Sequence, residues 1–253
     1  MAAKVRSQQF VKRSVVAARR LLLPSLRLAA PRRHTDADPF RLIDVPAERI
    51  THMQRRWRGS LDLPWLETGR FGRHASLLRR WHCGAVLDGD WDLAVEPFDE
   101  YHLTRVFHER FVQGKRWEDI HYVKRSLRTI AAGRSAWGGR CRTVEEVQAR
   151  CRYLDDLHTS LATEGFASEP SGASDFTHFV VNIGRDGTII RNNDGKHRIV
   201  LAKLLGIERL PARVFIRHRR WQAVRDAIRR GDAVEVLDLS GPHPDLVDLL
   251  GAG

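Results

Sequence analysis

The sequence is poor in cysteine and has no long hydrophobic run, and these two deficits exclude several classes of protein. Its three cysteines, Cys83, Cys141 and Cys151, form an odd set without a Cys-x-x-Cys pair. This argues against a disulfide framework and against a cysteine-based zinc site. The longest apolar runs are far shorter than the roughly 20 residues that a membrane-spanning helix needs. We therefore expect free thiols in a reducing cytoplasm, with peripheral contact to a membrane left open.

Acidic residues are absent from the first 33 positions. Apolar residues interleave with basic ones at helical spacing up to Pro24, which predicts an amphipathic helix. No clean hydrophobic core precedes a small-residue cleavage site, so a secretory signal is not expected. We treat residues 1–35 as a separate basic segment. Its nine cations are Lys4, Arg6, Lys12, Arg13, Arg19, Arg20, Arg27, Arg32 and Arg33.

Three interpretations of this basic segment stay open. It is a first helix packed on the domain, a helix lying on an anionic membrane surface, or a basic arm for nucleic acid such as DNA. An organellar transit peptide is also compatible with the composition. The whole chain of 253 residues carries a formal net charge of +12, which favours nucleotides, nucleic acid or anionic membranes as partners.

The stretch 179–222 carries the clearest structural signals, and we interpret the rest of the chain around it. Gly187 and Gly206 stand where a tight turn and a helix end call for positive φ. Residues 210–216, which follow Gly206, are expected to return as another strand. The expected order is a strand at 179–183, a turn at 185–187, a strand from 188, a strand break at 192–195, a helix, and a strand at 210–216.

The front of the expected helix reads Asp194-Gly195-Lys196-His197-Arg198 and predicts a phosphate-binding site. Unpaired backbone N–H groups and the positive end of the helix dipole attract anions. Gly195 admits a ligand close to the backbone, and the three basic side chains add charge and donors. These five residues are our candidates for nucleotide binding. In the alternative, structural interpretation, Asp194 caps the helix and the basic residues are solvated.

The Asp-Gly-x-His-Arg box, followed by an Ala/Leu-rich helix, a Leu-Gly turn and a Pro-containing strand, resembles the ParB/sulfiredoxin superfamily over residues 179–222. The resemblance implies an α+β fold, with a small mixed sheet and packed helices, over residues 36–253. It also implies that Gly195, His197 and Arg198 contact nucleotide phosphates. Lys196 and His197 stand where sulfiredoxin has its working cysteine, so peroxiredoxin repair is not expected.

An all-helical insertion is expected at about 97–165, where apolar residues follow helical spacing. Thr143-Val-Glu-Glu146 predicts a capping box at the start of its last helix. Such an insertion would form a lid or a substrate pocket over the nucleotide. Trp117, Trp137 and the pair Glu118-Asp119 are the side chains there that we single out, although tryptophan is more often a packing anchor than a ligand platform.

Three aspartates alternate in Asp88-Gly-Asp90-Trp-Asp92, close enough to share a face or a Mg²⁺ ion. The calcium-loop pattern is not met, because the Gly and the later Glu are out of place. We name Asp90 and Asp92, together with His197, as candidate catalytic groups. The structural alternative is a turn rich in aspartate.

The leading hypothesis is a nucleotide-binding protein that uses a nucleoside di- or triphosphate with Mg²⁺ for phosphoryl transfer or hydrolysis, as a kinase or nucleotidase. The first alternative is a ParB-like module that binds DNA or another polyanion without turnover. Only about 30 residues follow Trp221, too few for the helix-turn-helix domain of ParB-type DNA binders. The second alternative is a peripheral membrane protein that acts on lipid-linked or polysaccharide intermediates.

Overall fold

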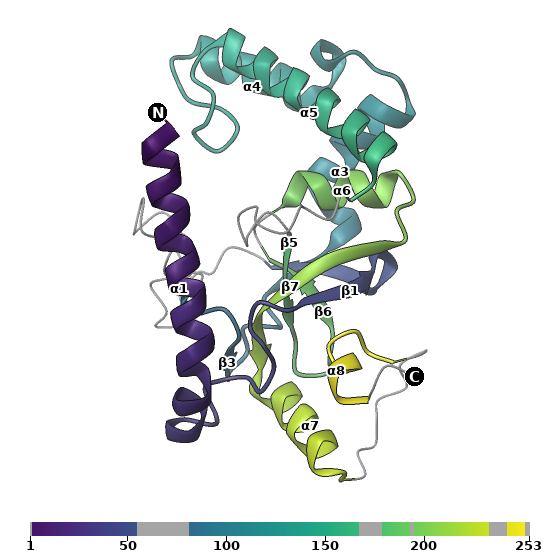
Figure 1. Ribbon diagram of the computed structural model, residues 1–253. Helices are drawn as coiled ribbons and strands as arrows, with labels where there is room; N and C mark the ends of the chain where they lie inside the picture. Colours follow the sequence, from purple (N-terminus) through teal and green to yellow (C-terminus); the bar gives the residue numbers. More distant parts are fainter. Residues whose placement is uncertain (1, 55–80, 167–178, 193–194, 233–241, 251–253) are drawn as a thin grey trace. The chain divides into compact units, whose positions relative to one another are not determined.

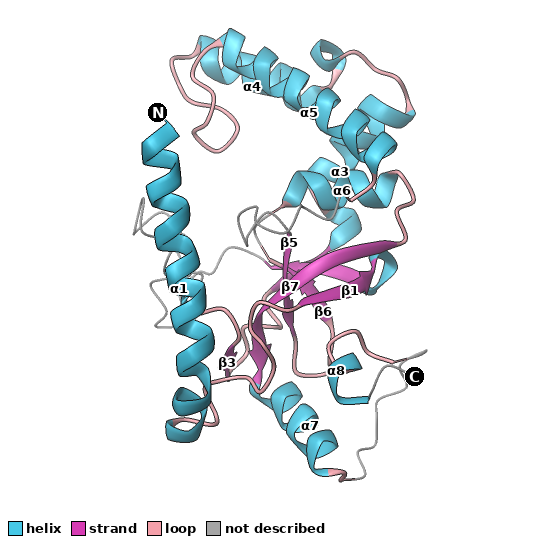
Figure 2. Ribbon diagram, viewed as in Figure 1, coloured by secondary structure: helices cyan, strands magenta, loops and turns pink. Residues whose placement is uncertain are grey.

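A computed structural model describes residues 2–54, 81–166, 179–192, 195–232 and 242–250 (Figure 1). The chain divides into two compact units. We call residues 1–97, 168–195 and 209–253 the sheet unit, and residues 98–167 and 196–208 the helical unit. The described elements are several helices and one small mixed sheet (Figure 2), which confirms the α+β class.

The sheet is built around its longest strand, β7 (Arg209–His218). β7 pairs antiparallel with β1 and parallel with both β5 and β3. The described strands follow the order β1-β7-β5-β6-β2-β4, with β3 as an additional partner of β7. The other strands are β1 (Leu42–Pro46), β2 (Ile50–Gln54), β3 (Ala85–Leu87), β4 (Val95–Pro97), β5 (Phe179–Ile183) and β6 (Ile189–Arg191).

The strand–turn–strand–helix–strand prediction for residues 179–216 is confirmed. β5 and β6 pair antiparallel around a turn in which Gly187 has a φ of +88°. The helix that follows ends before Gly206, whose φ is +69°. Both glycines occupy the left-handed region, where a side chain is disfavoured.

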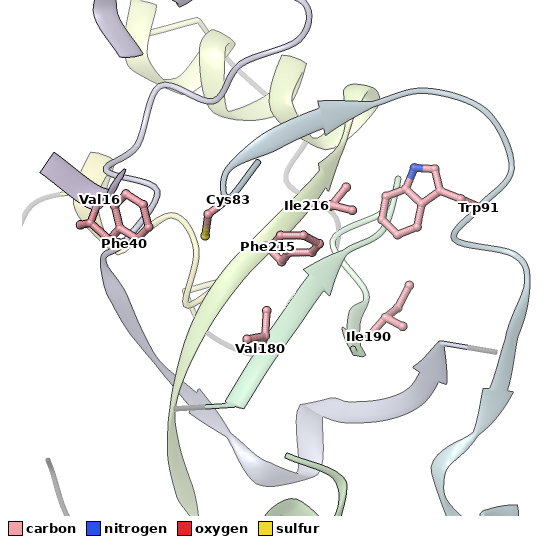
Figure 3. Packing of buried hydrophobic residues seen from close by; sticks show 8 residues of the cluster. All are labelled: Val16, Phe40, Cys83, Trp91, Val180, Ile190, Phe215 and Ile216. Atoms are coloured by element: carbon pink, nitrogen blue, oxygen red, sulfur yellow. The ribbon is translucent and has the colours of Figure 1, made fainter. Parts of the chain in front are cut away.

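In the core of the sheet unit, side chains of the central strands pack with side chains of α1 (Ala2–Ala29) and of the segment around β3 (Figure 3). Packing of apolar side chains from distant segments removes their surfaces from water and is the main stabilising term of such a fold. The members of this cluster are Val16, Phe40, Cys83, Trp91, Val180, Ile190, Phe215 and Ile216.

The basic N-terminal helix packs on the sheet unit along one side. Val16 and Leu23 are buried, and the Arg19 guanidinium donates a hydrogen bond to the Cys83 carbonyl. The helix continues through Pro24 to Ala29, beyond the end of the amphipathic pattern. Pro24 is exposed, and water can therefore hydrate the carbonyl that loses its intrahelical hydrogen bond.

A second basic segment, Arg217–Trp221, leads into α7 (Arg219–Arg230). Arg217 and Arg225 are nevertheless buried. The reason is a set of aspartates that supply the opposite charge. Arg217 donates to both carboxylate oxygens of Asp245 at 2.8 and 2.6 Å. Arg225 donates to both oxygens of Asp36 at 2.9 and 3.0 Å.

Within the sheet unit, this buried ion network holds residues 242–250 against β7 and α7. Asp245 also accepts from the Trp221 indole at 2.9 Å, and Asp248 of α8 (Val247–Leu250) pairs with Arg225 at 2.8 Å. Burial raises the pKa of Asp245, but Arg217 and the other donors outweigh burial and bring it to about 2. Asp245 is therefore ionised in the folded chain and pairs with the arginines around it.

The helical unit consists of short helices around two longer ones (Figure 2). α4 contacts α5, and α6 contacts both α3 and α5. Thr143 and Glu146 form the predicted capping box at the start of α5. The elements are η4 (Phe98–Glu100), α3 (His102–Phe107), the π-helical turn η5 (His108–Val112), η6 (Trp117–Asp119), α4 (His121–Ala131), α5 (Val144–Glu164) and α6 (Lys196–Leu204).

A search of the described helices finds none that is both apolar enough and long enough to cross a bilayer. All three cysteines are buried and free.

Candidate functional site

The predicted phosphate box lies at the start of α6. Asp194 lies outside the described residues, and Gly195 precedes the helix with a φ of +70°. Lys196, His197 and Arg198 form the first turn, where each is partly exposed. No acidic residue stands in this turn, so no carboxylate within it neutralises the positive end of the helix dipole. The four residues that follow them are buried, which fixes the helix within its unit.

Arg150 of α5 contacts the first turn of α6 at His197. Its guanidinium lies 3.0 Å from Nδ1 of the His197 imidazole. Because a guanidinium can only donate, Nδ1 accepts and the ring proton is assigned to Nε2. The Phe107 ring of α3 lies 5.9 Å from the imidazole, centroid to centroid. His197 is therefore held from two sides, by a cation and by an aromatic face.

Aromatic rings surround Arg150 on its other sides. The guanidinium carbon lies 4.7 Å from the Tyr153 ring centroid and 6.0 Å from that of Trp137. These distances are within the range of cation–π attraction. Among the described residues, no carboxylate lies within ion-pair distance of Arg150, and its Nε has no hydrogen-bond partner. Burial lowers the pKa of Arg150, yet an arginine side chain keeps its charge in proteins.

Trp137 is presented by a strained loop. Its φ is +54°, the only positive value of a non-glycine residue in the described part of the chain. The backbone N–H of Ala136 donates to the Cys141 carbonyl at 2.8 Å and closes the loop. The indole N–H of Trp137 is buried without a hydrogen-bond partner among the described residues. Strain of about 1–3 kcal/mol at such a residue is found most often where a side chain serves a binding site.

The aromatic series continues from Trp137 along α4 and α3. Trp137 meets Tyr122 edge-on at 5.2 Å, Tyr122 stacks on His102 at 5.3 Å, and His102 meets Tyr101 at 4.5 Å. Burial, and after it the nearby Lys196 ammonium, lowers the pKa of His102. The imidazole is therefore neutral at pH 7 and offers an uncharged aromatic face. We call Arg150, His197, Trp137, Tyr153, Tyr122 and His102 the aromatic–cationic cluster.

The sequence singled out only part of this cluster. Trp137 and His197 were named, but Arg150, Tyr122, Tyr153 and His102 were not. The spacing of Arg150 and Tyr153 by three residues on one helix is a usable signal. However, Arg150 and Tyr153 can be recognised as part of the cluster only when α6 is known to contact α5. No local sequence pattern predicts that contact.

The two candidate aspartates lie in the sheet unit, in the turn after β3, and both bind Arg185. Asp92 accepts from the Arg185 side chain at 2.9 and 2.8 Å and from its backbone N–H at 2.8 Å. Asp90 accepts from the same guanidinium at 2.7 Å. Burial opposes ionisation of Asp92, but the Arg185 hydrogen bonds prevail and its pKa is lowered.

This geometry matches the structural alternative of an aspartate-rich turn. A carboxylate with a lowered pKa is a weak base, and oxygens already bound by arginine do not fit a Mg²⁺ ion as ligands. Among the residues that the structure describes, no group of three or more His, Cys, Asp or Glu side chains is placed to hold a metal ion. We therefore derive no catalytic step through Asp90, Asp92 or a metal.

A hollow in the helical unit, lined by residues outside the aromatic–cationic cluster, has a volume of about 350 Å³. Apolar side chains of α4 and α5 line it, and Trp117 and Glu118 stand among its walls. The Trp117 indole donates to Asp155 at 2.9 Å, so this tryptophan is a packing anchor with a satisfied polar group. Trp137, by contrast, has an unsatisfied indole N–H and is the stronger candidate of the two.

We compared the chain with protein-family models, with curated proteins and with solved structures, and nothing matches it.

Proposed function

We propose that the protein binds a nucleotide at the aromatic–cationic cluster of the helical unit. In this proposal the phosphates lie against the first turn of α6 and Arg150, and the base lies against the aromatic rings. The observation that carries the proposal is the position of Arg150. It is a partly buried cation that touches His197 and two aromatic rings, and it has no carboxylate partner among the described residues.

A nucleotide has chemical groups that match both the cations and the aromatic rings of this cluster. Phosphate oxygens accept hydrogen bonds from guanidinium groups and from backbone N–H groups at a helix start. A base has a π-face that stacks on an aromatic side chain, worth about 1–3 kcal/mol. The unsatisfied Nε of Arg150 and indole N–H of Trp137 are donors that such a ligand would satisfy.

We extend the proposal to the ParB/sulfiredoxin type of site and to phosphoryl transfer or hydrolysis. Catalysis of that kind depends on positioning and on charge neutralisation. Lys196, Arg198 and Arg150 would neutralise phosphate charge. His197, with its Nδ1 engaged by Arg150, would donate its Nε2 proton to a phosphate oxygen. Mg²⁺ would arrive bound to the phosphates, and no residue is assigned to it.

The test is a calorimetric titration of wild type, Arg150→Gln and Arg152→Gln with ATP, ADP, CTP and GTP in the presence of Mg²⁺. Arg152 lies on the same helix and is exposed, so its variant has the same change of charge. Loss of a charged hydrogen bond of about 1.5–3 kcal/mol weakens binding roughly 10- to 150-fold. We expect this loss in Arg150→Gln alone. Equal affinities of the two variants for the nucleotide would show that the cluster is not the binding site.

Turnover is a separate question with its own assay. We expect release of inorganic phosphate, or its transfer to an acceptor, with whichever nucleotide binds, and we expect Arg198→Ala to slow it. Binding without turnover would keep the nucleotide site and refute the enzymatic part of the proposal.

A second candidate function follows from the length of the aromatic series. Trp137, Tyr122, His102 and Tyr101 contact one another in succession, and such a row could stack more than one base of a single strand. Affinity for an oligonucleotide that exceeds the affinity for every mononucleotide, and that falls steeply with salt, would favour this polyanion-binding function.

A further inference from the structure

Exposed apolar side chains form a stripe along α1. Leu21 is 79% exposed and Leu28 is 87% exposed, and their separation of about two helical turns places both on one side of the helix. Val11 and Leu22, at 45% and 46% exposed, widen this stripe. Single exposed leucines are common on proteins, but several on one helical face indicate a surface that binds something.

The opposite side of α1 holds the helix in place. Val16, Arg19 and Leu23 are buried in the sheet unit. Arg27 adds an ion pair with Asp226 of α7 at 2.6 Å. If α1 rotated about its axis until the stripe faced the sheet unit, these contacts would break. The stripe therefore remains exposed to solvent.

Positive charge accompanies the stripe. The first 33 residues contain nine Lys or Arg and no acidic residue, and the chain has a net charge of +12. Of these nine, Arg19 is buried, Arg20 pairs with Asp38 and Arg27 pairs with Asp226. Arg32 and Arg33, which follow the end of α1, are exposed. An occupant of this surface must therefore be apolar where it meets the leucines and anionic around them.

We propose that α1 docks on the surface of an anionic lipid bilayer, with the leucine stripe among the acyl chains and the basic residues at the headgroups. Such a bilayer supplies both chemistries at the required depth, since interfacial helices bury their apolar side by about 5–10 Å. A second copy of the chain fits less well, because two stripes in contact would bring two acid-free basic segments together. Nucleic acid would leave the leucines in water.

The experiment is co-sedimentation of the full chain with vesicles of phosphatidylcholine, alone or mixed with phosphatidylglycerol. We expect binding to the mixed vesicles that weakens with salt, and little binding to phosphatidylcholine alone. The double variant Leu21→Gln/Leu28→Gln should bind the mixed vesicles at least about ten-fold more weakly, since two leucines lose their burial. Leu93→Gln, at a residue 63% exposed elsewhere in the sheet unit, should bind as wild type does.

Three results would overturn the proposal. One is the absence of binding to mixed vesicles, and another is equal binding by the double variant. The third is self-association in sedimentation velocity that the double variant abolishes, because a second copy would then be the occupant. Nucleotide titration of the same double variant separates this proposal from the cluster, since α1 and the cluster belong to different units.

Discussion

Replacement of Asp245 by asparagine tests the buried ion network of the sheet unit. Asp245 is fully buried, and its two oxygens accept from Arg217 at 2.8 and 2.6 Å and from the Trp221 indole at 2.9 Å. Asparagine keeps the size of the side chain but removes the charge and one of the two acceptor atoms. Among the described residues Arg217 then has no carboxylate partner, although it remains 2% exposed.

The size of the effect follows from that burial. Removal of one partner from a buried ion pair costs about 3–5 kcal/mol, because the remaining charge stays away from water. The matched control is Asp232→Asn, which removes an exposed pair with Arg230 and should cost less than about 1 kcal/mol. The lowered pKa of Asp245, about 2 against an ordinary 3.8, predicts that this stabilisation is present above pH 3.8 and is lost as the pH falls toward 2.

The assay is urea unfolding followed by far-UV circular dichroism, together with hydrogen exchange of peptides from β7, α7 and α8. Exchange assigns the effect to the sheet unit, which a single global transition of a two-unit chain does not do. We expect faster exchange in α7 and α8 of Asp245→Asn and unchanged exchange in Asp232→Asn. A loss below about 1 kcal/mol in Asp245→Asn would refute the reasoning that this network stabilises the fold.

Two further predictions concern the same unit. Burial lowers the pKa of His243 from 6.5 to about 4. Between these two pH values the unfolded chain binds a proton at His243 that the folded chain does not bind. Urea unfolding should show stability falling by about 3 kcal/mol as the pH drops from 6.5 to 4, and His243→Gln should flatten this slope. Gly187 and Gly89 share a φ of +88°, but only a Cβ on Gly187 would clash, at 2.6 Å from the Trp221 ring. Thermal unfolding should show a loss of about 1–2 kcal/mol for Gly89→Ala and a clearly larger one for Gly187→Ala; equal losses would contradict the packing described.

Local patterns in the sequence predicted the elements around α6 well. The turn at Gly187, the cap at Gly206 and the capping box of Thr143 and Glu146 depend on neighbours within a few residues. Backbone preference and short-range hydrogen bonds decide such features, and both can be recognised in a single sequence.

Long-range pairings were not predictable in the same way. Arg225 binds Asp36 across 189 residues, so its burial cannot be inferred from a helix in which five of twelve residues are arginine. The pairing of β2 with β6, far apart in the chain, has the same character. Arg150 and His197, 47 residues apart, belong to one cluster only because α5 contacts α6.

Whether a nucleotide binds the aromatic–cationic cluster can be measured by a fluorescence titration that follows Trp137. Each nucleotide is added to wild type, Trp137→Phe and Trp117→Phe, with Trp117 serving as the control because its indole is already bound to Asp155. We predict quenching in wild type and in Trp117→Phe, and the loss of that quenching in Trp137→Phe. Quenching that persists unchanged in Trp137→Phe, or no quenching with any nucleotide, would contradict nucleotide binding at the cluster.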